Sequence, residues 1–539
     1  MRARWPWIVV GVLTLIGLLL RLHDYGQSLV GDELSTLWIV ENHNLADTVS
    51  FVKGDGEITP PLYFILAWLA TRLGDSPELV RLPAMVAGVV SIPLMYELGL
   101  RTAGKWSGLA SAAIFTCSPF MIYFSANGRA YSIMTLFLIG STLAMLAGAR
   151  TGRARWWVLF GAGTCLAMYS HYTAAFVLGA QLLWLLWACP GARKPALIST
   201  AVAAVLFLPW LPGLLSDLDS PTTEILSAIQ GSGWTAKKIG IETWAFGHPL
   251  MLPGELPGSA VMWAICVGLL IGLASIVFRG LIRAESVRES LAGIPKEYVL
   301  VAVLALATPV CEALLLLLGT DLLGARNLTA SSYGLLLAMG TIVASAGMVW
   351  GSVSAVLVLG GFAVAAGKSM EASAGNPDFI GAADYIEAES APDDVVIDAF
   401  GAGLSPVPLA PMDFYLRDGQ PLYHLNRPST PPPFLPFTTV IPSQDKLLQR
   451  AFRQADGRSI YIVKPDALQI SSVDDPGHES LDPTQPHWAD RELILPRGTE
   501  LLAAEPFDSL DPPTVLVIRA PVPQAKQGQQ EEAAKADSK

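Results

Sequence analysis

Two adjacent carboxylates, Asp32 and Glu33, follow the first long apolar run of the chain, in the sequence Gly31-Asp32-Glu33-Leu34. A carboxylate at a membrane surface suits general-base chemistry, because a hydroxyl acceptor must lose its proton as it attacks. An acidic pair in a polar loop is more often simply solvated, and that alternative stays open for the pair taken alone. Asp32 and Glu33 are therefore the candidate catalytic residues.

Two arginines lie where an apolar helix is expected to begin: Arg129, between Ser125 and Tyr131, and Arg326, between Asp321 and Asn327. Charged groups beside a membrane core are costly and tend to be functional. The planar guanidinium also matches phosphate oxygens with its fork of donors. For Arg129 the alternative is that it only anchors the helix end at the interface.

Further polar and aromatic groups lie in the same connections. His171, beside Tyr172, is a candidate for binding a substrate, a metal or a phosphate, or for capping a helix. Glu312, inside an apolar run, is expected to pair with another charge or to handle a proton. The connection 214–257 carries Trp234, Trp244 and Phe246, which we expect in an interfacial aromatic belt rather than against a sugar ring.

Long apolar runs must position these groups. Of the 539 residues, 52% are apolar and 15% are charged, against about 25% charged in soluble proteins. A span needs about 17–25 apolar residues. The sequence thus predicts a polytopic α-helical membrane protein with about eleven spans, at 5–22, 81–100, 106–125, 131–149, 156–171, 173–189, 195–213, 258–279, 297–319, 327–347 and 351–367.

The basic connections set the predicted sides of these spans. Arginines and lysines cluster near 101–105, 150–155, 193–194 and 279–296, and such loops face the cytoplasm. These clusters share one side with the N-terminal Arg2 and Arg4 only if the segment 60–74, which is short and begins with Pro60-Pro61, is an interfacial or re-entrant helix that does not cross. The N-terminus is then cytoplasmic, and Asp32, Arg129, His171 and Arg326 share the non-cytoplasmic face.

The domain division follows the change in composition near Lys368. Residues 1–367 form the predicted membrane domain, with an outer loop over 23–80. Residues 368–522 form a small soluble α/β domain on the non-cytoplasmic side, with strands at 395–397, 460–463 and 515–518 and helices at 378–390 and 445–456. The Pro-rich stretch 428–436 is a predicted loop, and 523–539 is a predicted disordered tail.

Composition and motifs exclude several functions. The net charge of −11 argues against nucleic acid as a partner. The chain has no Walker loop, no dinucleotide fingerprint and no HExxH motif, so a soluble nucleotide donor is unsupported. All five cysteines lie in apolar runs and are expected to be packing residues. An activated donor must therefore reach the outer face, which a lipid-phosphate-linked sugar can do.

The motifs in order resemble a known family. Asp32-Glu33, Pro60-Pro-Leu-Tyr63, Arg81-Leu-Pro83, the segment from Ser118 to Tyr131, Leu208-Pro-Trp-Leu-Pro212 and Arg326 together resemble the GT-C glycosyltransferases. Within these, the chain is similar to the glycosyltransferase 39 group, which includes protein O-mannosyltransferases and the lipid A aminoarabinose transferase. The resemblance covers the membrane part, about two thirds of the chain.

The resemblance implies a GT-C fold, a catalytic carboxylate in a large outer loop, and a polyprenyl-phosphate sugar as donor. Asp32 matches the general base, Glu33 is its neighbour that helps to orient the acceptor, and Arg129 and Arg326 match donor-phosphate ligands. The family often has an acidic residue at position 127 and Tyr at 327, where this chain has asparagines, and a charged residue at 59, where it has Thr. These departures leave the sugar and a divalent metal ion as open questions.

We therefore predict a polyprenyl-phosphate-dependent glycosyltransferase of the plasma or inner membrane, which moves a hexosyl or pentosyl group with inversion. Tyr63, Tyr131, His171 and Tyr172 are the predicted substrate contacts. The expected partners are the lipid-linked donor, a protein, glycan or lipid acceptor, and the bilayer. The alternative is a transporter or flippase for a lipid-linked or anionic substrate, although such proteins place their site near the midplane between repeats, and no internal repeat is evident.

Overall fold

The computed structural model describes residues 4–54, 57–219, 231, 233–283, 293–400, 411–425, 444–489 and 492–521. The chain divides into two compact units. The membrane unit comprises Met1–Gly26 and Ile39–Ala374, and the second unit comprises Gln27–Trp38 and Gly375–Lys539. The sequence-based boundary at 367/368 lies close to the start of the second unit, but the segment Gln27–Trp38 was not expected to belong there. The predicted loop 428–436 and the predicted tail 523–539 lie outside the described residues.

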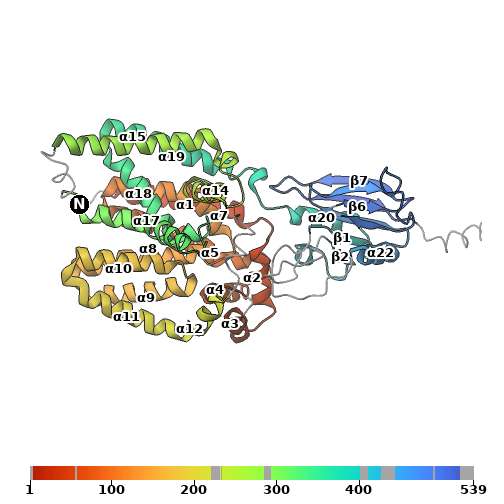
Figure 1. The fold of residues 1–539 in the computed structure, drawn as a ribbon, viewed down its shortest axis with the longest axis horizontal. Helices are drawn as coiled ribbons and strands as arrows, with labels where there is room; N and C mark the ends of the chain where they lie inside the picture. The colour runs from red at the N-terminus through yellow and green to blue at the C-terminus, as the bar shows by residue number, and fades with distance from the viewer. Residues whose placement is uncertain are drawn as a thin grey trace, which may run out of the picture. The chain divides into compact units, whose positions relative to one another are not determined.

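The membrane unit is a bundle of helices (Figure 1). Its longer helices are α1 (Trp5–Tyr25), α5 (Leu82–Thr102), α6 (Lys105–Cys117), α8 (Tyr131–Thr151), α9 (Ala154–Ser170), α10 (Ala174–Ala188), α11 (Arg193–Phe207), α14 (Trp234–Phe246), α15 (Ser259–Arg283), α17 (Lys296–Leu317), α18 (Ser332–Ser345) and α19 (Met348–Lys368). The shorter ones are α3 (Leu45–Lys53), α4 (Leu62–Ala70), η1 (Pro77–Arg81), α7 (Pro119–Ala126), η2 (Pro190–Ala192), η3 (Leu208–Trp210), α12 (Leu211–Leu218), η4 (Gly254–Gly258), η5 (Asn327–Ser331) and η6 (Ala372–Ala374). Helix α2 (Asp32–Glu41) begins in the second unit.

A helix or a helix pair coincides with each of the eleven predicted spans. Among the described residues, eight helices are long and apolar enough to cross a membrane, and the bent pair α6–α7 is a ninth candidate. The two other predicted spans are occupied by α9, with 17 residues, and α10, with 15. The predicted segment 106–125 is thus not straight, since α6 and α7 meet at 60°.

The interior of the bundle uses small residues and polar contacts. Ser107 and Thr341 hydroxyls lie 2.8 Å apart, and the Gln181 amide donates to the Thr142 hydroxyl at 2.8 Å. A Cβ at Gly334 would lie 2.4 Å from the Leu304 carbonyl carbon, so α17 and α18 meet backbone to backbone. Membrane helices are held together by van der Waals packing at close approach and by interhelical hydrogen bonds, because in lipid there is no hydrophobic driving force for their association.

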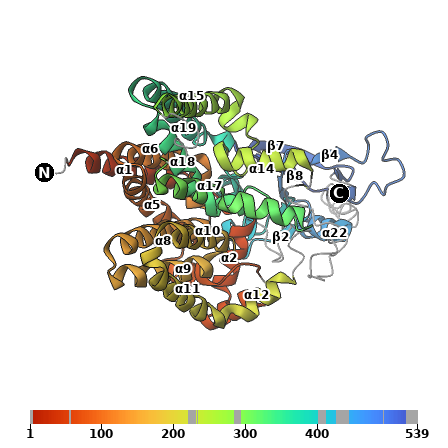
Figure 2. The same cartoon turned by 60° about the vertical axis from the view of Figure 1, so that its left-hand side comes forward.

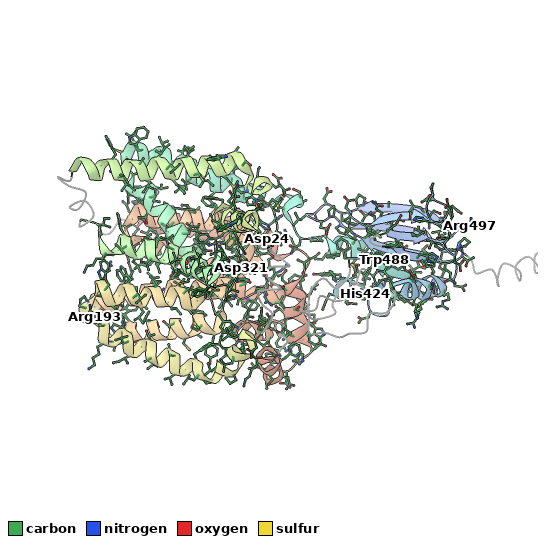
Figure 3. The ribbon with its side chains drawn as sticks, in the orientation of Figure 1. Asp24, Arg193, Asp321, His424, Trp488 and Arg497 are labelled. Atoms are coloured by element: carbon green, nitrogen blue, oxygen red, sulfur yellow. The ribbon has the colours of Figure 1, made fainter. Side chains whose placement is uncertain are left out.

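The two ends of the bundle carry different groups. Helices α9 to α11 lie on one side of the bundle, and α15 and α19 lie on the opposite side (Figures 1 and 2). Arg193, from a basic connection, lies at one end, whereas Asp24 and Asp321 lie toward the other (Figure 3). The predicted cytoplasmic and non-cytoplasmic faces require the basic connection with Arg193 and the two aspartates to lie at opposite ends of the bundle.

Helix α4 lies within the predicted interfacial segment 60–74. It contains nine residues, which at 1.5 Å per residue extend about 13 Å, far less than the ~30 Å of a hydrocarbon core. The helix starts directly after Pro60-Pro61 and ends at Ala70. Its length therefore fits the predicted non-crossing role.

The second unit is an α/β domain. Its larger sheet has the order β2 (Leu422–His424), β1 (Val395–Asp398), β3 (Ser459–Lys464), β8 (Thr514–Arg519) and β7 (Glu500–Pro506). Strands β2, β1 and β3 are parallel, and β8 runs antiparallel to both β3 and β7. A smaller sheet has the order β4 (Gln469–Ser472), β6 (Glu492–Leu495) and β5 (His487–Ala489).

Helices cover both faces of the larger sheet. Val395 and Ile397 pack with α22 (Gln444–Ala455), and the intervening Val396 packs with α20 (Phe379–Glu389) and α21 (Met412–Tyr415). Successive side chains of a strand point to opposite faces, so a continuous apolar run such as 395–397 predicts a strand buried on both sides. The predicted strands and helices of this domain all coincide with observed ones.

Candidate functional site

Arg129 is positioned by a break in the α6–α7 pair. Pro119 has no backbone N–H and cannot continue α6, so that helix ends at Cys117. Ser118 then caps α7, since its hydroxyl accepts the Met121 N–H at 3.4 Å. Helix α7 ends at Ala126 and α8 starts at Tyr131. The short connection between them carries Arg129 near the start of α8.

The guanidinium of Arg129 forms a two-pronged ion pair with Glu57. Its Nη1 lies 2.6 Å from Glu57 Oε2, and its Nη2 lies 2.9 Å from Oε1. The two side chains are only 10% and 8% exposed, and the guanidinium lies 5.9 Å from the Phe64 ring centroid. The Glu57 carboxylate therefore holds the guanidinium of Arg129 in one orientation and compensates its charge.

Sequence reasoning missed Glu57. It drew attention to position 59, where this chain has Thr, but the carboxylate stands two residues earlier, before the Pro60-Pro61 pair. A wider search for an acidic residue upstream of the proline pair would have found it. Its partner Arg129 lies 72 positions away in sequence, so no local pattern could connect the two residues.

His171 lies in the connection between α9 and α10, outside both helices. Its ring lies 5.3 Å from the Tyr131 ring, and its Nδ1 accepts the Thr173 N–H at 3.3 Å. In the neutral ring the proton is therefore on Nε2, which leaves a donor there. Burial, together with the positive charges of Arg129 and Arg326, lowers the pKa of His171 to about 4.

Arg326 reaches this group from a different part of the chain. The residues before it are held by the Lys237 ammonium, which lies 2.6 Å from Asp321 Oδ1 and donates to the Leu323 carbonyl at 3.0 Å. The Asn327 amide donates to the Leu322 carbonyl at 2.7 Å. The charges of Arg129 and Arg326 both lower the pKa of His171, so these three residues form one charged region, in which Glu57 pairs with Arg129.

Two of the predicted substrate contacts serve the fold in this structure. Tyr63 is 1% exposed and donates to the Val80 carbonyl at 2.5 Å. The Tyr172 hydroxyl donates to the Asp217 carboxylate and accepts the Trp210 Nε1–H at 2.9 Å. Burial and the Asp217 contact both raise the pKa of Tyr172, so this hydroxyl stays protonated. Tyr131, in contrast, lies against His171.

The connection between α12 and α15 contains side chains that are buried more deeply than those of an interfacial aromatic belt. Trp234 is exposed, as the belt predicts, but Trp244 is 7% exposed and donates to the Ser332 hydroxyl at 2.9 Å. His248 is buried, with its ring 5.0 Å from the Tyr123 ring. The belt prediction is therefore wrong for Trp244, because its N–H finds a partner on α18 instead of at the interface.

Asp32 and Glu33 belong to the second unit, together with the rest of Gln27–Trp38. Asp32 is the first residue of α2 and is exposed, whereas Glu33 is fully buried. A carboxylate in the first turn of a helix is stabilised by the helix dipole. No group of three or more metal-binding side chains occurs in the parts of the chain that the structure describes.

A family model described as dolichyl-phosphate-mannose-protein mannosyltransferase matches residues 59–212. This range includes Arg129 and His171 but neither Asp32 nor Arg326. A putative mannosyltransferase of Bacillus subtilis, YkcB, is 28% identical over 173 residues, which are 30% of this chain and 23% of that protein. The chain thus matches about a quarter of the length of this curated relative.

Solved structures resemble the chain more broadly. The apo oligosaccharyltransferase of Archaeoglobus fulgidus superimposes with a TM-score of 0.50 at 13% identity, over 86% of this chain and 70% of that one. ArnT of Cupriavidus metallidurans in the apo state gives a TM-score of 0.40 at 15% identity, over 95% and 97% of the two chains. The match of residues 59–212 to the mannosyltransferase family model confirms the predicted resemblance, and the fold shared with the oligosaccharyltransferase confirms the predicted fold class.

Proposed function

We propose that this GT-C-type membrane protein is a glycosyltransferase that moves a hexosyl or pentosyl group from a polyprenyl-phosphate donor to a hydroxyl acceptor on the non-cytoplasmic face. The observation that carries the proposal is that Arg129, held by Glu57 through both terminal nitrogens, lies two residues before Tyr131, whose ring is 5.3 Å from the ring of the buried His171. The match of residues 59–212 to a dolichyl-phosphate-mannose-dependent family supports the choice of donor.

The charged region suits the phosphate of such a donor. Two guanidinium groups and the Nε2–H of a neutral imidazole supply donors for phosphate oxygens at a buried place, where electrostatic interactions are stronger than in water. Glu57 holds Arg129 in one orientation through both terminal nitrogens. Preorganised charge of this kind stabilises the leaving phosphate without reorganisation during the reaction.

Asp32 is the proposed general base, on the basis of its motif and its exposed place at the start of α2. The acceptor oxygen forms a bond to the anomeric carbon while its proton passes to the Asp32 carboxylate. The bond from the anomeric carbon to the phosphate oxygen breaks, and polyprenyl phosphate leaves with its electron pair. One displacement inverts the anomeric configuration, and a phosphate leaving group needs no proton. Glu33 is proposed to support Asp32 from its buried place one residue along α2.

The first test is transfer of labelled sugar from a purified polyprenyl-phosphate donor by the full-length protein. Asp32→Asn should abolish transfer while the protein stays folded, and near-normal transfer by this variant contradicts the base assignment. Movement of the intact lipid-linked substrate across vesicles without transfer would instead favour the transporter alternative.

The second test concerns the donor site. Arg326→Ala should reduce transfer by roughly 10²–10³, since the loss of one such charge costs about 3–4 kcal/mol. Arg193→Ala is the matched control, because Arg193 lies at the other end of the bundle (Figure 3). Equal effects of the two variants would remove the support for a phosphate site at Arg326.

A further inference from the structure

The residues directly before Asp32 are bound by the C-terminal domain, within the second unit. The Leu29 N–H donates to the Tyr415 hydroxyl at 2.7 Å, and the Ser28 hydroxyl accepts the Ile380 N–H at 3.1 Å. Asn376 makes two more bonds: its side-chain amide donates to the Ser28 carbonyl, and its N–H donates to the Gln27 side chain, both at 2.9 Å. Four hydrogen bonds thus join residues 27–29 to a region about 350–390 positions away in sequence.

Burial strengthens this attachment. Leu29 is fully buried and Ser28 is 2% exposed. Val30 packs against the apolar cluster that contains Phe379 and Met412, on the α20 and α21 side of the sheet. A buried backbone N–H such as that of Leu29 must find a partner, and here the partner is a side chain of the C-terminal domain.

The attachment determines how α2 begins. Gly31 has a φ of +53°, a conformation that strains any residue with a Cβ. The turn that it makes allows the Glu33 N–H to donate to the Val30 carbonyl at 3.2 Å. Asp32 therefore stands one residue beyond a glycine turn, whose preceding residues are fixed by the C-terminal domain.

We propose that the C-terminal domain is a positioning element for the catalytic carboxylate: through Tyr415, Asn376 and the backbone of Ile380, it holds residues 27–30 so that α2 starts at Asp32. This inference rests on the proposed role of Asp32 as the base. The positioning residues do not touch substrate themselves and act through Asp32.

The test is Tyr415→Phe, which removes the acceptor of the buried Leu29 N–H. We expect the kcat for transfer to fall about 5- to 30-fold at an unchanged KM for the donor. Amide hydrogen exchange at 28–33 should become faster. Tyr423→Phe is the matched control in the same domain, because the Tyr423 hydroxyl bonds the exposed side of α22 at Gln454, and it should change neither quantity.

A second variant keeps the test decisive if Tyr415→Phe does not fold. Ser28→Ala removes the acceptor of the Ile380 N–H and should act in the same direction on kcat. If any transfer remains in the Asp32→Asn variant, adding Tyr415→Phe should not lower it further, because a positioning residue acts only through the group it positions. Faster exchange at 28–33 with a wild-type kcat overturns the positioning role. Full activity of Asp32→Asn overturns the base assignment instead, so the two failures are distinguishable.

Discussion

Separation of Glu57 from Arg129 provides the most direct check of the candidate site. The pair is bidentate and both side chains are about nine-tenths buried. Removal of one partner leaves the other charge buried without compensation, which typically costs about 3–5 kcal/mol. Glu57→Ala and Arg129→Ala should therefore each lower the free energy of unfolding by about this amount.

The double variant should lose much less than the sum of the two single losses, because it leaves neither charge uncompensated. We expect a coupling free energy of roughly 2–3 kcal/mol, the upper range for residues in direct contact. Denaturant unfolding of the protein in detergent measures all three variants. The control cycle is Lys238 with Glu242, an exposed pair in the same unit with a 3.7 Å separation, for which near-additivity is expected. Additivity within about 0.5 kcal/mol at Glu57 and Arg129 would refute the buried pair.

Three further predictions concern packing, pH and the histidine. Gly334→Ala should destabilise the bundle, because the added Cβ would lie 2.4 Å from the α17 backbone. Gly140→Ala is the control and should be tolerated, because nothing lies within 4 Å of a Cβ there. Melting curves in detergent compare the stability of the two variants. Burial lowers the pKa of His424, but contacts with Asp398 and Asp413 raise it overall to about 9. The pKa of His424 in the folded protein thus exceeds the ordinary value of ~6.5. The stabilisation of the second unit by protonated His424 is therefore complete below pH ~6.5 and is lost as the pH rises toward about 9. In His424→Gln, hydrogen exchange of this unit should depend less on pH. His171→Gln should retain more transfer than His171→Asn, since only Gln extends a donor to the place of Nε2–H.

The helical part of the fold was largely predictable, because each span is a long apolar run whose ends carry charges, prolines or glycines. The bend between α6 and α7 was not predicted, although Ser118-Pro119 is a common start of a helix. Helix α2 was also missed. Glu33, Ser35 and Thr36 are polar and yet buried, so the spacing of the apolar residues does not reveal the buried side of this helix.

The site was predictable residue by residue but not as a set of contacts. Arg129, His171 and Arg326 stand at the ends of apolar runs, so their location near one end of the bundle follows from span counting. The ion pair of Arg129 with Glu57 and the attachment of residues 27–30 to the C-terminal domain join positions far apart in sequence. Such contacts depend on tertiary packing, which no local pattern of residue types encodes.

The neutral state of His171 gives the charged region a specific character. An imidazolium beside two guanidinium groups would add repulsion at a buried place, and the structure avoids this because burial and both arginines keep the pKa of His171 at about 4. Thr173 fixes the proton on Nε2 by occupying Nδ1. The neutral ring can therefore donate a hydrogen bond from Nε2 to a phosphate oxygen, whereas its basic nitrogen, Nδ1, already accepts the Thr173 N–H. The acceptor proton in the proposed reaction thus needs another base, which is the role assigned to Asp32.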